Sequence, residues 1–303
     1  MAPYRGPIID AHHHLWDYGM GKHAWLDKTS EGEGLPMGDL APLRRNFLVE
    51  DYLAEAQGEN VVATVHVEAG WSGGAEGEES AWLDTLDRRV VAARHVVRVP
   101  LDAPEAPALI AREARHSRMS GLRDIVAWHP DPARSFAARP HLMADAGWRM
   151  GLAALFEAGH PFDLMLYPHQ MDEAARLAGD FPQGTFILNH CGSPADRSAE
   201  GMEGWREGLT RLAGCRNVLI KISNPVAYDH HWTEASLAQV ILHCLDTFGA
   251  ERSMFGSDAP VSGLQAPFRR LLGVYRKILA DRPAAAQRAF FHDTAARAYK
   301  LQE

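Results

Sequence analysis

Histidines occupy three successive positions near the start of the chain, within residues 10–14 (Asp-Ala-His-His-His). The apolar residues before them predict a buried strand, along which side chains point to alternate faces. We therefore expect Asp10, His12 and His14 to share one face of this strand. His13 should then point to the opposite face. Two imidazoles on one face could bind a divalent cation, or donate hydrogen bonds to one polar group of a substrate.

Two further candidates, His190 and Asp258, each follow a short apolar run. If that run is a strand, alternation places His190 on the same face as Phe186 and Leu188. Taken alone, a histidine at a strand end is more often a hydrogen-bonded core residue than a ligand. An aspartate before Ala-Pro can equally cap a turn. These two residues become site candidates only if the fold brings them to the N-terminal histidine pair.

Eight apolar or β-branched runs predict the strands that would position these residues. The runs are Ile8–His14, Val61–Glu68, Val96–Leu101, Gly121–Ile125, Phe162–Tyr167, Phe186–His190, Val218–Ser223 and Ser253–Gly256. Stretches of helical period lie between them. The clearest predicts a helix over 234–248, with Thr233 as its N-cap and Gly249 at its end. Further helices are expected over Met171–Ala178 and, closing the chain, over Ala295–Leu301.

Eight strands that alternate with helices in a chain of 303 residues favour a closed, parallel (β/α)₈ TIM barrel. An open doubly wound sheet is the alternative, but its G-x-G-x-x-G signature does not follow the first strand. No linker rich in proline, glycine or serine divides the chain, so we expect residues 1–303 to form one domain. In such a barrel the C-terminal strand ends meet at one mouth. His12 and His14 should therefore lie close to His190 and Asp258.

Three imidazoles and a carboxylate suit one divalent ion, with zinc the first choice. The ion would lower the pKa of a water molecule and polarise a carbonyl group. Asp258 would accept the proton of the attacking water and deliver it to the leaving group. Without a metal, the histidines could instead donate hydrogen bonds to the carbonyl oxygen while Asp258 acts as the base.

Four short motifs are spread over the chain: D-A-H-H-H at 10–14, G-L-R at 121–123, N-H-C-G at 189–192 and G-S-D-A-P at 256–260. This set resembles the amidohydrolase-related (amidohydrolase 2) family of the amidohydrolase superfamily. Within that family, the chain is most similar to the branch of sugar-lactone and 2-pyrone-4,6-dicarboxylate lactonases. The resemblance implies a barrel hydrolase that opens a small lactone by attack of an activated water. It assigns the paired histidines to His12 and His14, the later histidine to His190, and the final aspartate to Asp258.

The chain departs from the family pattern at the fourth strand, where Arg123 stands near the position of a lysine or glutamate that would bridge two metals. The resemblance therefore implies at most one metal, and the lactonase branch includes members that work without any. Two other functions remain open. One is a metal-dependent decarboxylase of an aromatic or unsaturated acid on the same barrel. The other is a non-catalytic ligand-binding barrel, although mere binding does not need a poised carboxylate.

Other polar and aromatic residues near strand ends are candidates for substrate binding: Arg123, His66, Glu68, His169, Trp16 and Trp25. Arg123 could hold a substrate carboxylate with two parallel hydrogen bonds, or pair internally with Glu68 or Asp124. His66 and Glu68 share a face near the end of the second strand, where they border the pocket or are satisfied buried groups. Lys221 on the seventh strand needs a buried partner.

Aromatic residues and loops leave further alternatives open. Trp16 and Trp25 could form an apolar wall of the pocket, although aromatic side chains more commonly pack loops onto a barrel. His169 follows the fifth strand, where some amidohydrolases place a metal ligand, or begins the next helix. The long connection 16–46 is a candidate substrate lid. The glycine-rich stretch 70–77 is expected to be a mobile loop.

Composition excludes several classes of protein. The hydrophobic content of 46% allows a sizeable core, while the net charge of −8 and the lack of a basic run argue against nucleic-acid binding. No apolar run is long enough to span a membrane, and the first ten residues lack the apolar core of a secretion signal. The three cysteines are scattered, as in reduced thiols of a cytoplasmic protein. We expect a small-molecule substrate, and assembly into a homo-oligomer remains open.

Overall fold

The computed structural model describes residues 3–27 and 35–301. Eight parallel strands form one sheet and pair in the order of the sequence. They are β1 (Ile8–His13), β2 (Val61–Val67), β3 (Arg94–Val97), β4 (Met119–Arg123), β5 (Phe162–Leu164), β6 (Phe186–Leu188), β7 (Val218–Ser223) and β8 (Ser253–Gly256). The ring is completed by backbone hydrogen bonds from Asp258 to His12 (2.7 Å) and from His14 to Ala259 (2.8 Å). The predicted (β/α)₈ barrel is thus confirmed.

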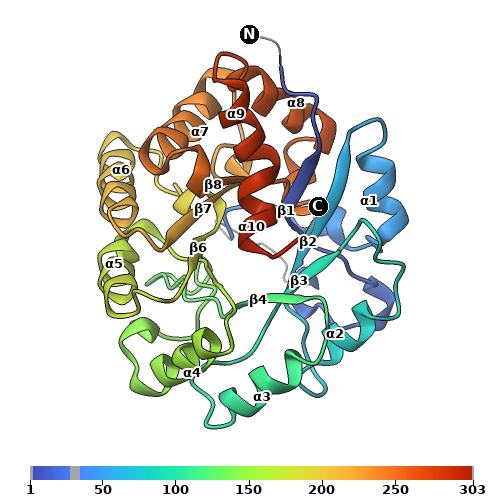
Figure 1. The fold of residues 1–303 in the computed structure, drawn as a ribbon, viewed down its shortest axis with the longest axis vertical. Coiled ribbons are helices and arrows are strands. Elements are labelled where there is room, and N and C mark those ends of the chain that lie inside the picture. Colours follow the sequence, from blue (N-terminus) through green and yellow to red (C-terminus); the bar gives the residue numbers. More distant parts are fainter. Residues whose placement is uncertain (1–2, 28–34, 302–303) are drawn as a thin grey trace.

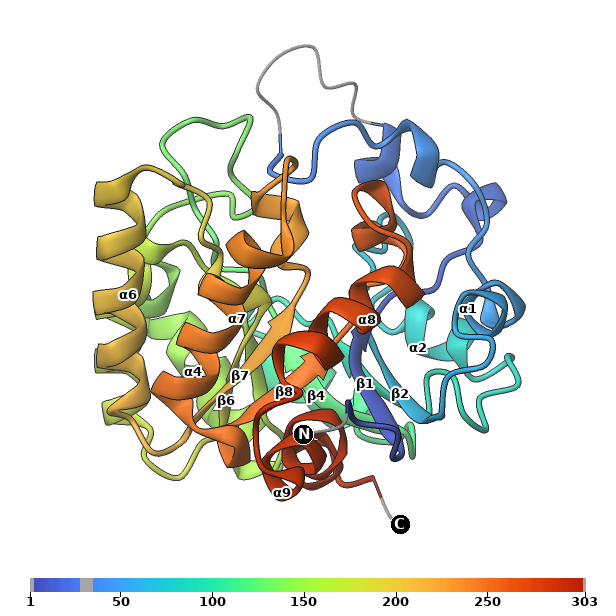
Figure 2. The same cartoon turned by 90° about the horizontal axis from the view of Figure 1, so that it is seen from above.

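Helices surround this ring, and the last of them lies across one end of it (Figure 1). They are α1 (Val49–Glu55), α2 (Glu78–Leu83), α3 (Ala106–Glu113), α4 (Ala146–Glu157), α5 (Met171–Asp180), α6 (Ala199–Ala213), α7 (Glu234–Phe248), α8 (Phe268–Ile278), α9 (Ala284–Arg288) and α10 (Thr294–Ala298). Figure 2 shows the loops after β1 and β4 on one side of the barrel and both termini on the other. Across residues 3–27 and 35–301, no helix is long and apolar enough to cross a bilayer.

The seventh and eighth strands and helix α7 have the predicted bounds, and Thr233 caps α7 by accepting a hydrogen bond from Ser236 N–H. The third strand was placed too late in the sequence. It ends at Val97, before Pro100, which has no N–H to donate to a sheet. Helix α5 continues through Gly179 to Asp180, and α10 ends at Ala298, short of the predicted Leu301.

The inside of the barrel is apolar at the end that α10 covers. Ile9, Val65, Val96 and Met254 form one cluster there with Tyr299, which follows α10. A buried ion pair lies beside this cluster, between Lys221 Nζ and Asp163 Oδ2 at 2.5 Å. The hydroxyl of Tyr299 also donates a hydrogen bond to Asp163 (2.7 Å). The expectation that Lys221 needs a buried partner is therefore confirmed.

Asp124 follows β4 and points away from Arg123, which pairs with Glu68 instead. Its carboxylate accepts hydrogen bonds from the indole N–H of Trp148 (2.9 Å) and the backbone N–H of Leu101 (3.1 Å). Burial raises the pKa of Asp124 to about 6, and these two hydrogen bonds oppose the rise. The folded chain therefore binds a proton at Asp124 more tightly than the unfolded chain does.

We expect the Asp124→Asn variant to become more stable relative to the wild type as the pH rises from about 4 to above 6. Since the folded wild type binds more protons over this range, its free energy of unfolding decreases as the pH rises. Asparagine has no proton to lose, so the free energy of unfolding of the variant should gain about 2 kcal/mol relative to that of the wild type over this range. Urea unfolding of both proteins at either end of the range measures this difference in stability. An unchanged difference would contradict the prediction.

Candidate active site

The structure brings the four polar residues at the strand ends to one place. His12, His190 and Asp258 each offer a ligand atom, and these atoms lie within 4.8 Å of one another. His14 Nε2 is 3.1 Å from Asp258 Oδ1, and His12 Nε2 is 3.4 Å from the same oxygen. The ring centroids of His12 and His190 are 4.5 Å apart. The barrel was predicted to bring the four residues of this cluster together, and the structure does so. The role of each residue is a proposal.

Strand β1 does not present its side chains by simple alternation. Asp10 accepts a hydrogen bond from the hydroxyl of Tyr52 on α1 (2.7 Å), outside the ring of strands. His12 instead lies 3.5 Å from Lys221 Nζ, inside the barrel. The pairing of β1 with β2 is irregular between Asp10 and His13, which adds a residue to the pleat. The prediction that Asp10 and His12 share a face is therefore wrong.

Asp10 forms hydrogen bonds with the segment that carries Asp258. Its carboxylate accepts hydrogen bonds from the backbone N–H of Ser257 (2.7 Å) and from the Ser257 hydroxyl (2.5 Å). Burial raises the pKa of Asp10 to about 6, and the hydrogen bonds from Ser257, Tyr52 and His12 lower it in part. Asp10 thus holds the end of β8 against β1, although it does not face the cluster.

Backbone strain concentrates around the cluster. Eight described residues other than glycine have positive φ, and five of them lie here: His190 (49°), Cys191 (57°), Ser193 (53°), Asn224 (43°) and Asp258 (59°). Such conformations each cost on the order of 1 kcal/mol and collect at functional sites. His190 reaches the cluster because β6 ends at Leu188 and the chain turns left-handed there. The assignment of His190 to the face of Phe186 and Leu188, which pack in the outer core, is therefore wrong.

Burial and neighbouring groups shift the pKa values of Asp258, His12 and His190 below their ordinary values, which favours a charged carboxylate and two neutral imidazoles. Burial by itself raises the pKa of Asp258, but His190, His14 and the amide of Asn224 outweigh it and hold the pKa below its ordinary value. Burial is the main cause that lowers the pKa of His190 to about 4 and that of His12 well below its ordinary value. Neutral imidazole is the form that binds metal ions.

Asn224 is a residue that the sequence analysis missed. Its Nδ2 donates a hydrogen bond to Asp258 Oδ2 at 2.5 Å, on the side of the carboxylate opposite His14. The available signal was the Asn-Pro pair directly after β7, since asparagine tolerates the left-handed backbone that this turn requires. Together, Asn224 and His14 fix the plane of the Asp258 carboxylate.

The residues present fit a metal ion. The Nδ1–H of His14 donates to the carbonyl of Val67 (2.7 Å), which turns Nε2 toward Asp258 Oδ1 at 3.1 Å. His12 Nε2 is buried and has no hydrogen-bond partner among the residues that the structure describes. An unpaired buried nitrogen beside a buried carboxylate is the arrangement that a bound cation would satisfy.

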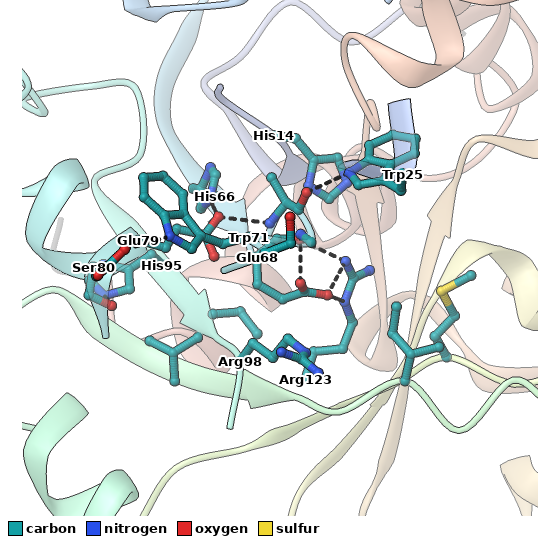
Figure 3. A pocket seen from close by; sticks show the side chains of 18 of the residues that line it. His14, Trp25, His66, Glu68, Trp71, Glu79, Ser80, His95, Arg98 and Arg123 are labelled. Atoms are coloured by element: carbon teal, nitrogen blue, oxygen red, sulfur yellow. Dashed lines mark hydrogen bonds and ion pairs between the residues drawn. The ribbon is translucent and has the colours of Figure 1, made fainter. Parts of the chain in front are cut away.

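Three residues of the cluster, His14, His190 and Asp258, line a cavity of about 570 Å³. Trp25, His66, Glu68, Trp71 and Arg123 line it as well (Figure 3). Residues 70–77, the expected glycine-rich loop, also line it. Of the expected lid 16–46, Trp25, Leu35 and Met37 reach the cavity, and residues 28–34 lie outside the described residues. A cavity of this size suits a small molecule such as a single sugar ring.

The candidates on β4 and on or directly after β2 border the cavity, but each of them forms hydrogen bonds or an ion pair with other residues of the chain. Arg123 forms an ion pair with Glu68, which is the internal alternative that the sequence left open. The Nδ1 of His66 accepts a hydrogen bond from the N–H of Leu15 (3.1 Å), so its Nε2–H donates to Glu79 (3.1 Å). Glu79, on α2, is a second residue that sequence analysis missed.

Two of the aromatic and histidine candidates lie elsewhere. Trp16 is fully buried, donates its indole N–H to the carbonyl of Arg45 (2.7 Å) and packs beside Phe47, so it holds a loop onto the barrel. His169 stacks on Tyr167 in the turn before α5 and is not among the residues that line the cavity. Trp25 does line the cavity, and its indole N–H is anchored on the carbonyl of Ala69 (2.8 Å).

Comparisons with known proteins identify the family of the chain. The family model described as amidohydrolase matches residues 9–301. The chain is 31% identical to the uncharacterised protein y4mH of Sinorhizobium fredii, over 97% of this chain and 98% of that protein. It is 28% identical to the L-fucono-1,5-lactonase of Burkholderia multivorans, over 97% of this chain and 96% of the relative. A crystal structure of an amidohydrolase from Burkholderia multivorans with bound zinc has a TM-score of 0.81 and 26% identity, covering 98% of this chain and 100% of that one. The chain therefore belongs to the amidohydrolase family.

Proposed function

We propose that this protein hydrolyses a small lactone, either a sugar lactone or a carboxylated one, by attack of a water molecule on the ring carbonyl. The observation that carries the proposal is the charged Asp258 carboxylate, which lies among three histidines and lines a cavity of about 570 Å³. The similarity over nearly the whole chain to an L-fucono-1,5-lactonase supports a lactone as the substrate.

Asp258 acts on the proton of the attacking water. The water oxygen forms a bond to the carbonyl carbon while Asp258 accepts its proton, and the proton passes to the ring oxygen as the carbon–oxygen ester bond breaks. Asn224 and His14 hold the two oxygens of the carboxylate, so the group is oriented before the substrate arrives. The hydroxy acid that leaves has gained one water molecule in total.

A single divalent ion, zinc by choice of ligands, would be held by His12, His190 and Asp258, with His14 beside them. When bound, such an ion polarises the carbonyl and makes water more acidic. The chain's own part is to keep the imidazoles of His12 and His190 neutral by burial and to hold the ligand rings in place. Ser223, whose hydroxyl lies 3.0 Å from His190 Nδ1, and Val67, which accepts from His14, orient the two rings.

Purified wild-type protein is expected to contain about one equivalent of zinc per chain, and His12→Ala is expected to contain less than about a tenth of that. The reason is that His12 supplies a buried nitrogen that no other described group satisfies. Elemental analysis after gel filtration measures the content. His231→Ala, at an exposed position, is the control. Full turnover by protein from which a chelator has removed the metal would exclude the ion from the mechanism.

A panel of lactones tests the proposed reaction. Ring opening releases a carboxylic acid, so a pH indicator reports turnover of sugar lactones and of 2-pyrone-4,6-dicarboxylate in weak buffer. Release of carbon dioxide from aromatic acids, without acid release from any lactone, would favour a decarboxylase. Stabilisation against heat by a lactone without turnover would indicate a binding barrel.

A further inference from the structure

The ion pair between Glu68 and Arg123 fixes the charge of one cavity wall. Arg123 Nε lies 2.7 Å and Nη2 lies 2.6 Å from Glu68 Oε1, and Nη2 also donates to the backbone carbonyl of Glu68 (2.8 Å). The other carboxylate oxygen accepts the N–H of Gly70 at 2.9 Å. Figure 3 shows the two side chains facing each other, and both line the cavity. Both are at least nine-tenths buried, so water screens the pair poorly.

This pair leaves little positive charge for a ligand on its own wall of the cavity. Three of the five N–H groups of Arg123 are engaged by Glu68, which leaves a ligand at most the two on Nη1. Further carboxylates line the cavity, among them Glu79 and Asp258. Arg98 is the other arginine among the described lining residues, and it is exposed to solvent.

We propose that Glu68 and Arg123 restrict this site to uncharged, hydroxyl-rich lactones and reject lactones that carry a carboxylate. The inference rests on the proposed lactone hydrolysis and names its substrate class. A substrate carboxylate that approached Arg123 would have to displace Glu68, whose buried charge would then lack its partner. A substrate hydroxyl can accept from Nη1 or donate to Glu68 while the pair stays intact. The wall therefore selects because Glu68 already neutralises the positive charge that a substrate carboxylate would need.

Two lactones that differ in one group test this selection. D-Glucono-1,4-lactone and D-glucaro-1,4-lactone share the ring and differ only in whether the terminal carbon is a hydroxymethyl group or a carboxylate. We expect the wild type to prefer the glucono compound by at least about 100-fold in kcat/KM. In Glu68→Gln the preference should decrease about 10-fold or more, because Arg123 gains a free positive charge. The double variant E68Q/R123Q removes that charge and should restore the preference.

The matched control is Glu59→Gln, which breaks another Glu–Arg ion pair, with Arg276 (2.5 Å), away from the cavity. It should leave the ratio of the two substrates unchanged. Equal ratios in the wild type and Glu68→Gln, or a wild type that prefers the glucaro compound, would overturn the selection by charge.

Binding measurements separate this inference from the proposed reaction. Calorimetric titration of Asp258→Asn with the two lactones is expected to give tighter binding of the glucono compound, and the double variant D258N/E68Q should lose most of that difference. If no lactone is hydrolysed by the wild type, the proposed function fails and these affinities still decide the selection. Equal affinities of Asp258→Asn for both compounds would overturn it.

Discussion

The Asp258→Asn variant is expected to hydrolyse lactones about 10³-fold more slowly than the wild type, with its fold intact. Asparagine has nearly the shape of aspartate and can keep one oxygen within reach of His14 or Asn224. It cannot accept a proton at neutral pH, so the attacking water loses its base. The initial rates of both proteins on the same lactone panel give the magnitude, and thermal unfolding of both shows whether the fold is retained.

A loss of activity in Asp258→Asn has two readings, because the carboxylate is also a candidate metal ligand. Metal analysis of the variant separates them: a variant that keeps its metal and loses turnover assigns the proton transfer to Asp258. The control is Asp180→Asn, which changes an exposed carboxylate that pairs with Arg149 on the outer surface. Equal rates for the wild type and Asp258→Asn would remove Asp258 from the mechanism.

Hydrophobic patterning was sufficient to predict the barrel, since eight short runs rich in apolar or β-branched residues alternate with stretches of helical spacing. Where the local pattern and the cap agree, as in α7 with Thr233 and Gly249, even the bounds are correct. Strand ends were less predictable. The third strand was misplaced because Val99 and Leu101 are buried beside it without belonging to the sheet. An apolar pattern indicates that residues are buried, but a buried residue need not form backbone hydrogen bonds with a neighbouring strand.

The sequence was sufficient to predict which residues form the cluster, but not the directions in which their side chains point. The barrel rule alone places the ends of β1, β6 and β8 at one mouth, so residue type at those ends was sufficient for the cluster. Strict alternation failed twice, at Asp10 because of the irregular register in β1, and at His190 because of its left-handed backbone. Asn224 and Glu79 escaped because their importance depends on contacts with residues far away in sequence.

The buried pair of Lys221 and Asp163 carries the largest expected effect on stability. Each of Lys221→Met and Asp163→Asn is expected to lower the free energy of unfolding by about 3–5 kcal/mol, since each leaves one buried charge without its partner. Both side chains are fully buried, and Asp163 also accepts hydrogen bonds from Tyr299 (2.7 Å) and Asn189 (3.0 Å). These neutral donors remain in Lys221→Met, but they do not replace the charge of the ammonium group.

The double variant K221M/D163N decides whether the two losses have one cause. In the wild type, Lys221 Nζ lies 4.9 Å from the centroid of the Tyr299 ring. In the double variant an apolar methionine packs against this ring, and the amide that replaces the carboxylate of Asp163 can still accept a hydrogen bond from the Tyr299 hydroxyl. We therefore expect the double variant to be at least about 2 kcal/mol more stable than the sum of the single losses predicts. Chemical unfolding of all four proteins gives this coupling energy. Strictly additive losses would show that the two charges do not stabilise each other, and that the end of the barrel under His12 depends on packing alone.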